Sequence, residues 1–369
     1  MARKNNTKIV VDTASPHTIK KFELIEEYVK TWAQKLLNYE KCNGIVFIDC
    51  MCNSGVYQDD AGQEIFGTPI RISKLLATAM QSYPSKQAYL CYNDFSSEKI
   101  EILKTHLPPD TDNFHVETHI GDGNDLLRQI AVGPLQKLKM NYLLVYDPYT
   151  ASIDWEALAP FLNSWGEVIL NHMVSDPIRG VSQAKSINTV AKYEETYRAK
   201  INELVALSSD REAFENKIRE IISELQQNSN QRYLASFPFF NRNNVLVYNL
   251  IHCSGNIEGF KLFKKTTWKT FGGKSSAKNT HGLENQLMLD FSGSGVIETA
   301  TDDYCYYISD IAKYLAKTFK GQGSVSFDDI YSVLDIHPVF PSEGFRTEIK
   351  QELKNHHGVV VGKKTMSFK

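Results

Sequence analysis

The sequence predicts a doubly wound α/β fold of the Rossmann-like type, in which helices cover both faces of a mostly parallel sheet. Over the first two thirds of the chain, short apolar segments of strand length alternate with longer segments of helical periodicity. The apolar segments are nearly continuous, which is typical of parallel strands buried on both faces. Several of them end in an aspartate and a turn, and open α/β sheets bind ligands at the carboxyl ends of their strands.

The expected elements follow one another in a regular order. Helices are expected where apolar residues recur at helical spacing, over residues 22–37, 69–83 and 96–107. Pro69 suits a first helical turn, and Ser96 suits an N-cap. Strands are expected over the apolar runs 44–49, 88–94, 114–122, 142–149, 167–172 and 243–253. Strands separated by helices require crossover connections, so most of them should be parallel.

The regular alternation stops in two places, which divide the chain. Residues 189–228 are charged and helical, and we interpret them as a helical hairpin inside an insertion of about 182–230. Residues 272–282 are rich in Gly, Ser, Lys and Asn and are the best candidate for a linker. We therefore expect one domain over 1–271 and a second over 283–369.

Composition excludes several classes of protein. The chain has 369 residues, 42% hydrophobic and 23% charged, so it is neither collagen-like nor wholly disordered. No apolar run approaches the roughly 20 residues of a membrane span, and the N-terminus lacks a signal-peptide stretch. Six cysteines without a C-x-x-C pair indicate reduced thiols, so we expect a cytoplasmic protein with no metal. The net charge of −2 does not by itself indicate a nucleic-acid partner.

The most informative segment is FIDCMCNSGVY, residues 47–57, in which an apolar strand ends at Asp49 and a turn closes on Ser54 and Gly55. Such a loop lets the backbone approach a ligand at the carboxyl edge of a doubly wound sheet. Asn53 suits it, because Asn tolerates left-handed backbone geometry better than most residues. Asp49 is placed to order the loop or to meet a cationic or hydroxyl group; the alternative is a plain strand–turn–helix connection.

Aspartates also stand at the ends of the following strands. Asp94 ends the second strand, Asp122 the third and Asp147 the fourth. Because parallel strands have their carboxyl ends at one edge, we expect these carboxylates to lie together, with Asp94 suited to ribose hydroxyls. Aspartate also favours turns and helix caps, so each of them could instead be structural.

Together these segments resemble the class I S-adenosylmethionine-dependent methyltransferases, and more closely the bacterial three-Cys-motif partner protein family (TcmP-like). The resemblance covers roughly residues 16–270. It rests on five segments: Pro16-His17-Thr18 with Lys21, the FID…SGVY loop, Gly67-Thr68-Pro69, Asp147-Pro148-Tyr149 followed by Trp155, and NLIHCSG…GFKLFKK. The Gly-Thr-Pro segment and the H-x-x-x-K start are also similar, more distantly, to bacterial ribosomal-RNA adenine-N6 methyltransferases.

The resemblance implies S-adenosylmethionine as cofactor. The residues implied to bind it are Asp49, Asn53, Ser54, Gly55, Asp94 and Asp122. Catalysis would lie at Asp147, Pro148 and Tyr149, where the carboxylate and nearby carbonyls accept hydrogens from an exocyclic amine and the tyrosine stacks on the base. In a duplex, the base would have to flip out. The alternative is a strand that ends in an Asp-Pro turn with a packed tyrosine.

Two further pairs of residues are candidates. His17 and Lys21 are four residues apart and share a face of the first helix, so they could line the mouth of the cofactor or substrate site. Equally, the segment around His17 could be only a helix start. Cys50 and Cys52 form a C-x-C pair, but two ligands do not make a zinc site, so we expect small buried thiols.

A basic segment with interspersed aromatic residues runs from Gly259 to His281. It contains six lysines and no acidic residue. This composition suits a groove for nucleic acid. It equally suits an amphipathic strand whose aromatic residues are core and whose lysines are solvated.

The last 70 or so residues predict a winged helix-turn-helix domain. The expected order is a helix (303–319), a strand (324–327), two helices (328–334 and about 342–355) and a hairpin (359–368). On its third helix, Arg346, Lys350 and Lys354 form a basic stripe suited to phosphates. Winged helices also serve as protein-interaction modules, and three glutamates on the same helix dilute its positive field.

The leading hypothesis is an S-adenosylmethionine-dependent methyltransferase that acts on nucleic acid, DNA or RNA, at a base amine. The alternative is a catalytically weak nucleotide-binding regulator that docks on nucleic acid or on a three-Cys-motif protein of radical-SAM type, the partner that the family resemblance implies. Met51 and Asn53 favour the alternative, because they replace two glycines of the usual D-x-G-x-G-x-G loop. A nicotinamide dehydrogenase is disfavoured, because G-x-G-x-x-G is absent.

Overall fold

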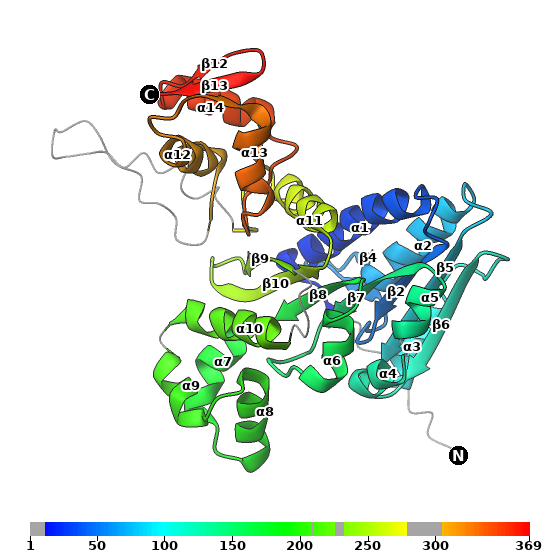
Figure 1. Cartoon of the computed structure of the whole chain (residues 1–369). Helices are drawn as coiled ribbons and strands as arrows, with labels where there is room; N and C mark the ends of the chain where they lie inside the picture. Colours follow the sequence, from blue (N-terminus) through cyan, green and yellow to red (C-terminus); the bar gives the residue numbers. More distant parts are fainter. Residues whose placement is uncertain (1–11, 131, 209, 226–231, 279–304) are drawn as a thin grey trace, which may run out of the picture.

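The structure, a computed structural model, describes residues 12–130, 132–208, 210–225, 232–278 and 305–369. Its centre is a seven-stranded sheet in the order β6-β5-β2-β7-β8-β10-β9 (Figure 1). In chain order the strands are β2 (Gly44–Asp49), β5 (Gln87–Asp94), β6 (Phe114–Ile120), β7 (Met140–Tyr146), β8 (Glu167–His172), β9 (Tyr233–Phe240) and β10 (Leu246–Ser254). The first five pair in parallel, and β10 is antiparallel to both β8 and β9. The predicted doubly wound, Rossmann-like sheet is confirmed.

The order of the strands reverses at β2, which sets the position of the site. From β2 the chain continues to β5 and β6 on one side, and then returns to β7 and β8 on the other. The crevice outside the carboxyl ends of β2 and β7 is therefore the topological switch point, where open α/β sheets bind ligands. Asp49 is in register with Tyr92 of β5 and Val145 of β7, so these strands end at nearly one level.

Helices cover both faces of the sheet because β2 alternates between two apolar cores. Ile45 and Phe47 pack into one core, and Val46 and Ile48 into the other. The first core holds α1 (Pro16–Leu37), α2 (Thr68–Met80), α3 (Ser97–Lys104) and α11 (Ile257–Thr270). The second holds α4 (Gly123–Gln129), α5 (Val132–Lys137) and α6 (Trp155–Leu162), together with the insertion.

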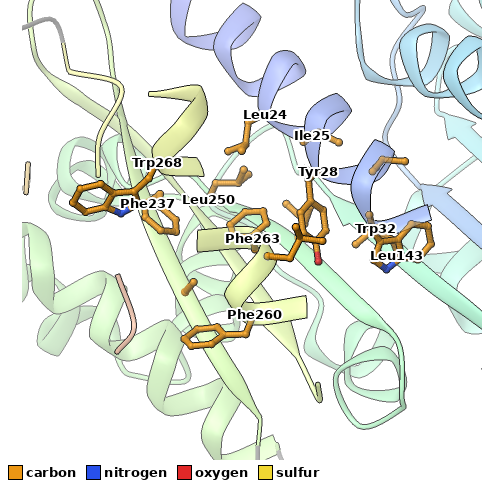
Figure 2. Packing of buried hydrophobic residues seen from close by; sticks show 14 of the residues in the cluster. Leu24, Ile25, Tyr28, Trp32, Leu143, Phe237, Leu250, Phe260, Phe263 and Trp268 are labelled. Carbon is orange, nitrogen blue, oxygen red and sulfur yellow. The ribbon is translucent and has the colours of Figure 1, made fainter. Parts of the chain in front are cut away.

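In the first core, α1 and α11 pack directly on each other on one face of the sheet. Figure 2 shows Tyr28 of α1 against Phe263 of α11, and their ring centroids are 5.1 Å apart. Although α1 has 22 residues, its outer face is charged. In the described part of the chain, no helix is both long and apolar enough to cross a membrane.

The predicted helical insertion is present, but it is not a simple hairpin. It consists of α7 (Ser175–Gly180), a 3-10 turn (Val181–Gln183), α8 (Ile187–Tyr197), α9 (Ile201–Leu207) and α10 (Arg211–Leu225). Arg198 adopts a left-handed φ of 47°, which ends α8 early and separates α9 from it. Buried Tyr193, Tyr197 and Phe214 attach the insertion to the second core.

The strand β9 was not predicted from the sequence. Its segment contains Pro238, which cannot donate a ladder hydrogen bond and therefore argues against a central strand. β9 lies at the edge of the sheet and, among the described strands, pairs only with β10, where Pro238 is opposite Asn249. A proline is tolerated at the edge of a sheet, because an edge strand forms ladder hydrogen bonds on one side only.

A small sheet that the sequence analysis did not anticipate lies beside the first loop. It consists of β1 (Asp12–Thr13), β3 (Val56–Gln58) and β4 (Glu64–Phe66), in the order β1-β3-β4. Because β3 begins directly after Gly55, this sheet fixes the exit of the loop.

The C-terminal unit follows the predicted order of elements. It contains α12 (Ile308–Thr318), β11 (Gly323–Ser326), α13 (Phe327–Asp335), α14 (Arg346–His356), β12 (Val360–Val361) and β13 (Thr365–Phe368), with a sheet in the order β11-β13-β12. The expectation that the third helix begins near residue 342 was wrong. Gly344 has a φ of 86°, which is incompatible with a right-handed helix, so α14 starts two residues later.

The basic segment from Gly259 is a helix and not the amphipathic strand that one interpretation expected, although its aromatic residues are core residues as that interpretation predicted. Up to Thr270 it is the helix α11, and residues 279–281 lie outside the described chain. Phe260, Phe263 and Trp268 of this helix are buried in the first core. The ammonium of Lys264, also buried, donates to the carbonyls of Leu334 (2.7 Å), Asp335 (3.0 Å) and His337 (2.6 Å), so α11 holds the C-terminal unit.

Candidate active site

The first loop is shaped by two residues with left-handed backbone geometry. Asn53 has a φ of 59° and Gly55 a φ of 69°, as the sequence predicts for Asn53. A Cβ atom on Gly55 would lie 2.9 Å from the side chain of Ile70 and 3.0 Å from Pro69, so glycine is required where the loop packs on α2. Asp49, at the end of β2, is only 4% exposed and accepts from the backbone N–H of Met51 at 3.4 Å.

Asp94 connects the second strand to this loop. Its Oδ2 accepts from the backbone N–H of Asn53 at 3.0 Å, and its Oδ1 accepts from that of Ser96 at 2.9 Å. The side-chain amide of Asn53 donates to Asp12 at 2.8 Å, and Lys99 donates to the same oxygen at 3.1 Å. Asp12 and Lys99 were not predicted from the sequence, because no spacing relates them to the loop.

The Asp122 carboxylate is the N-cap of α4. It accepts from the backbone N–H groups of Asn124 (2.7 Å) and Asp125 (3.4 Å), and the residue is exposed. The helix-cap role that the sequence left open is therefore present. The cap also fixes the start of α4 beside the loop, since a Cβ on Gly123 would lie 2.4 Å from the carbonyl oxygen of Cys50.

Asp147 lies immediately after β7, across the switch point from Asp49. Its two oxygens accept from the ammonium of Lys21 and from the side-chain amide of Asn171. The Asp147 side chain is 28% exposed, so it can still be reached from outside. Pro148 is buried and fixes the turn, whereas Tyr149 is 77% exposed and projects from it.

The two candidate residues of α1, His17 and Lys21, occupy different positions at the site. Lys21 reaches Asp147, and its Nζ also lies 5.2 Å from the centre of the Tyr248 ring. His17 packs against the same ring with centroids 5.8 Å apart, and its carbonyl accepts from the Tyr248 hydroxyl at 3.1 Å. Burial and then the charge of Lys21 lower the pKa of His17, so it is neutral at pH 7.

The crevice is electrostatically suited to a cation. Burial, and next the charge of Asp147, raise the pKa of Asp49 to about 7. Burial and the charges of Asp147 and Asp49 also raise the pKa of Tyr57 well above its usual value. Lys21 offsets only part of this negative potential, so a positively charged ligand group would be stabilised between the two aspartates.

Aromatic side chains line the same edge. Tyr57 packs on Phe22 with centroids 5.1 Å apart, and a Cβ on Gly67 would lie 2.6 Å from its ring, which explains the glycine before the Thr-Pro start of α2. Phe95, directly after Asp94, is 82% exposed. The hydroxyl of Tyr149 lies 3.4 Å from Lys99. Phe95 could have been predicted as a site residue, because it directly follows the end of a strand. Asn171 and Tyr248 could not, because they come from strands far along the chain.

Cys50 and Cys52 belong to the first loop, whereas the basic stripe lies on α14 of the C-terminal unit. Cys50 and Cys52 are buried, as predicted, and burial raises the pKa of both thiols. Over the described ranges, no group of three or more His, Cys, Asp or Glu residues could hold a metal ion. In α14, the Arg346 guanidinium lies 4.3 Å from the Tyr331 ring and the Lys350 ammonium 3.9 Å from the Phe327 ring, while Lys354 is exposed.

The similarities of this chain to known proteins are distant and come from solved structures. No family model matches this chain, and no curated protein matches it. Among solved structures, it is similar to protein LPL1258 from Legionella pneumophila, of family DUF519, with 12% identity, a TM-score of 0.40 and coverage of 68% of this chain and 92% of that one. Human methyltransferase-like protein 13, solved in complex with SAH, has 10% identity, a TM-score of 0.33 and coverage of 73% and 99%. The methyltransferase CalO6 has 11% identity, a TM-score of 0.26 and coverage of 64% and 66%.

Proposed function

We propose that this protein transfers a methyl group from S-adenosylmethionine to a base amine of a nucleic acid. The observation that carries the proposal is the placement of Asp49 and Asp147 on either side of the switch point, at the ends of neighbouring parallel strands. One carboxylate is deeply buried and the other partly accessible, so they suit two different tasks.

The cofactor would lie over the first loop. Asp49 and the backbone of Asn53, Ser54 and Gly55 would hold it, and Asp94 would accept from ribose hydroxyls. The fit is supported by the negative potential at Asp49 and Asp147, because the sulfonium of the cofactor is a cation. When bound, S-adenosylmethionine supplies an electrophilic methyl group.

Asp147 would orient the acceptor amine. A carboxylate has about four lone-pair sites, and the described donors, Lys21 and Asn171, use two of them. The remaining sites can accept hydrogens from an exocyclic amine and so localise its lone pair on nitrogen. Pro148 has no N–H to compete for these acceptors. Tyr149, which is exposed, would stack on the base.

Nucleic acid would also contact the C-terminal unit, for which we retain the winged-helix interpretation. The stripe of Arg346, Lys350 and Lys354 on α14 supports this contact, and Lys354 is exposed. The first two cations lie over aromatic rings, which orients them without neutralising them. The partnership with a three-Cys-motif protein stays a prediction.

Two observations favour the alternative, a regulator that binds the cofactor without turning it over. Both oxygens of Asp147 already accept hydrogen bonds from the chain, and Met51 stands where a loop glycine is usual. In that case S-adenosylhomocysteine would bind, but no methyl group would be transferred.

The decisive experiment combines binding and transfer. Calorimetry with S-adenosylmethionine and S-adenosylhomocysteine tests the cofactor site, and radiolabelled methyl transfer to total cellular RNA and DNA tests the reaction. Binding with transfer supports the proposal, binding without transfer selects the regulator, and no binding of either form contradicts both. The control variant for these measurements is Asp112→Ala, which removes an exposed carboxylate just before the amino end of β6.

A further inference from the structure

A large hollow lies at the opposite edge of the sheet from the candidate active site. Its volume is about 1360 Å³, more than the 300–1,000 Å³ typical of sites for drug-sized ligands. Asn141 at the start of β7, Glu167 at the start of β8 and Gly255 just after β10 line it. Because β7 and β8 are parallel, these residues mark the amino edge. A strand of six residues spans about 20 Å, so this cavity is separate from the crevice at Asp49.

The lining of this amino-edge cavity carries an excess of positive charge. Four cations line it, Lys35, Lys41, Lys139 and Arg232, against two carboxylates, Glu167 and Glu258. Lys35 lies 3.9 Å from Glu258, whereas Lys41 and Lys139 form no ion pair with a residue that the structure describes. The chain as a whole has a net charge of −2, so this local excess is a feature of the site. It favours an anionic group.

The floor of the cavity is a buried carboxylate with one free oxygen. Glu167 Oε2 accepts from the Tyr28 hydroxyl and lies 2.8 Å from His252 Nε2, and all three side chains are buried. Within the described ranges, Glu167 Oε1 has no hydrogen-bond donor. A carboxylate held in this way is fixed in orientation and suits a hydroxyl or amine of a ligand.

Unpartnered polar atoms gather on the same lining residues. Trp32 Nε1, Trp165 Nε1 and Asn141 Oδ1 are buried and lack a hydrogen-bond partner among the described residues. Two of these atoms are indole N–H donors and the third is an amide oxygen, and neighbouring atoms of the chain cover all three. The ring of Trp165 is partly exposed and offers a flat apolar surface to the cavity, whereas Trp32 is only 2% exposed.

We propose that the amino-edge cavity binds a nucleoside phosphate. The phosphate would lie at the lysines, the ribose hydroxyls would donate to Glu167, and the base would lie against an indole. In such a ligand the phosphate anion matches the lysines, the ribose hydroxyls match Glu167, and the planar base matches the indole. The proposal does not rest on methyl transfer at the other edge.

The test is calorimetric titration of the full chain with AMP, with adenosine and inorganic phosphate as parallel probes, at saturating S-adenosylhomocysteine. We expect AMP to bind at least about tenfold more tightly than either probe. Lys35→Ala/Lys139→Ala should reduce the affinity for AMP at least about tenfold and leave that for S-adenosylhomocysteine unchanged. The matched control Lys104→Ala/Lys317→Ala removes two exposed lysines elsewhere and should bind AMP as the wild type does.

Each other result contradicts the proposal. Absence of AMP binding at millimolar concentration, or equal binding by the Lys35→Ala/Lys139→Ala variant, would place no nucleotide in the cavity. Inorganic phosphate that binds as tightly as AMP would indicate an anion site without recognition of a nucleoside. Asp94→Ala separates the two edges, because it should weaken S-adenosylhomocysteine but not AMP.

Discussion

Lys21, in the second turn of α1, forms an ion pair with Asp147, which lies 126 residues further along the chain at the end of β7. Lys21 is only 8% exposed, and the Asp147 side chain 28%. The pair therefore fixes the direction of the one accessible carboxylate at the switch point, and it connects the first helix to the centre of the sheet.

The first prediction concerns this carboxylate. Asp147→Ala should reduce methyl transfer at least about 100-fold, because it removes the acceptor for the amine hydrogens. Affinity for S-adenosylhomocysteine should hardly change, since the interaction is made mainly in the transition state. Tyr149→Phe should keep most activity and Tyr149→Ala should lose it, because only the ring stacks. Wild-type transfer by Asp147→Ala, measured with radiolabelled methyl groups, would exclude the mechanism.

The second prediction concerns cofactor affinity. Asp94→Ala should weaken S-adenosylhomocysteine binding by about 1–3 kcal/mol, because ribose hydroxyls lose their acceptor and the N–H of Asn53 loses its partner. Calorimetry on this variant and on Asp112→Ala gives the difference. If Asp94→Ala and Asp112→Ala bind S-adenosylhomocysteine with equal affinity, Asp94 stabilises the loop but does not contact the cofactor.

The third prediction separates backbone strain from steric overlap. Gly55 and Gly62 both have a positive φ, 69° and 77°, but only Gly55 is in close contact with its neighbours. Gly62→Ala should lower the free energy of unfolding by about 1–2 kcal/mol, because an alanine is strained in the left-handed conformation. Gly55→Ala should cost clearly more, because its Cβ would lie 2.9 Å from Ile70. Denaturant unfolding of both variants checks this, and equal losses would mean that α2 can shift.

The fourth prediction is a pH dependence set by Asp49. Burial and Asp147 raise its pKa in the folded chain to about 7, above the value of about 3.9 in an unfolded chain. The folded state therefore holds more protons between pH 4 and 7, so this group's contribution to stability is full below pH 4 and is lost as pH rises to 7. The slope should approach 1.4 kcal/mol per pH unit at most. Unfolding free energies of wild type and Asp49→Asn over this range should diverge accordingly; parallel curves would contradict the prediction.

The fifth prediction concerns the basic stripe of α14. If Arg346, Lys350 and Lys354 each neutralise one phosphate, changing all three to alanine should reduce the salt slope of duplex binding by about 3. Fluorescence anisotropy at several salt concentrations measures the slope. An unchanged slope would mean that the stripe faces solvent or a protein partner.

The sequence allowed the parallel sheet, the switch-point aspartates and the geometry of Asn53 to be predicted, because each depends on local pattern. Residues brought in from other elements could not be predicted. Asn171 donates to Asp147 from β8, and Tyr248 packs on His17 from β10, and neither has a fixed spacing from its partner. The edge strand around Pro238 was missed because its proline indicates a loop unless the neighbouring strands are known.

If the proposed nucleic-acid substrate binds α14, the attachment of α11 has a consequence for the choice of target. Lys264 and Trp268 bind four carbonyls of the C-terminal unit, and the same helix packs through Phe263 on Tyr28 of α1. Because α11 is attached at both sides, the distance between α14 and Asp147 is fixed. A nucleic acid held on α14 would present whichever nucleotide lies at that distance along its path. Its curvature and the position of its bulges or ends would then decide which base is reached, with no need to read sequence.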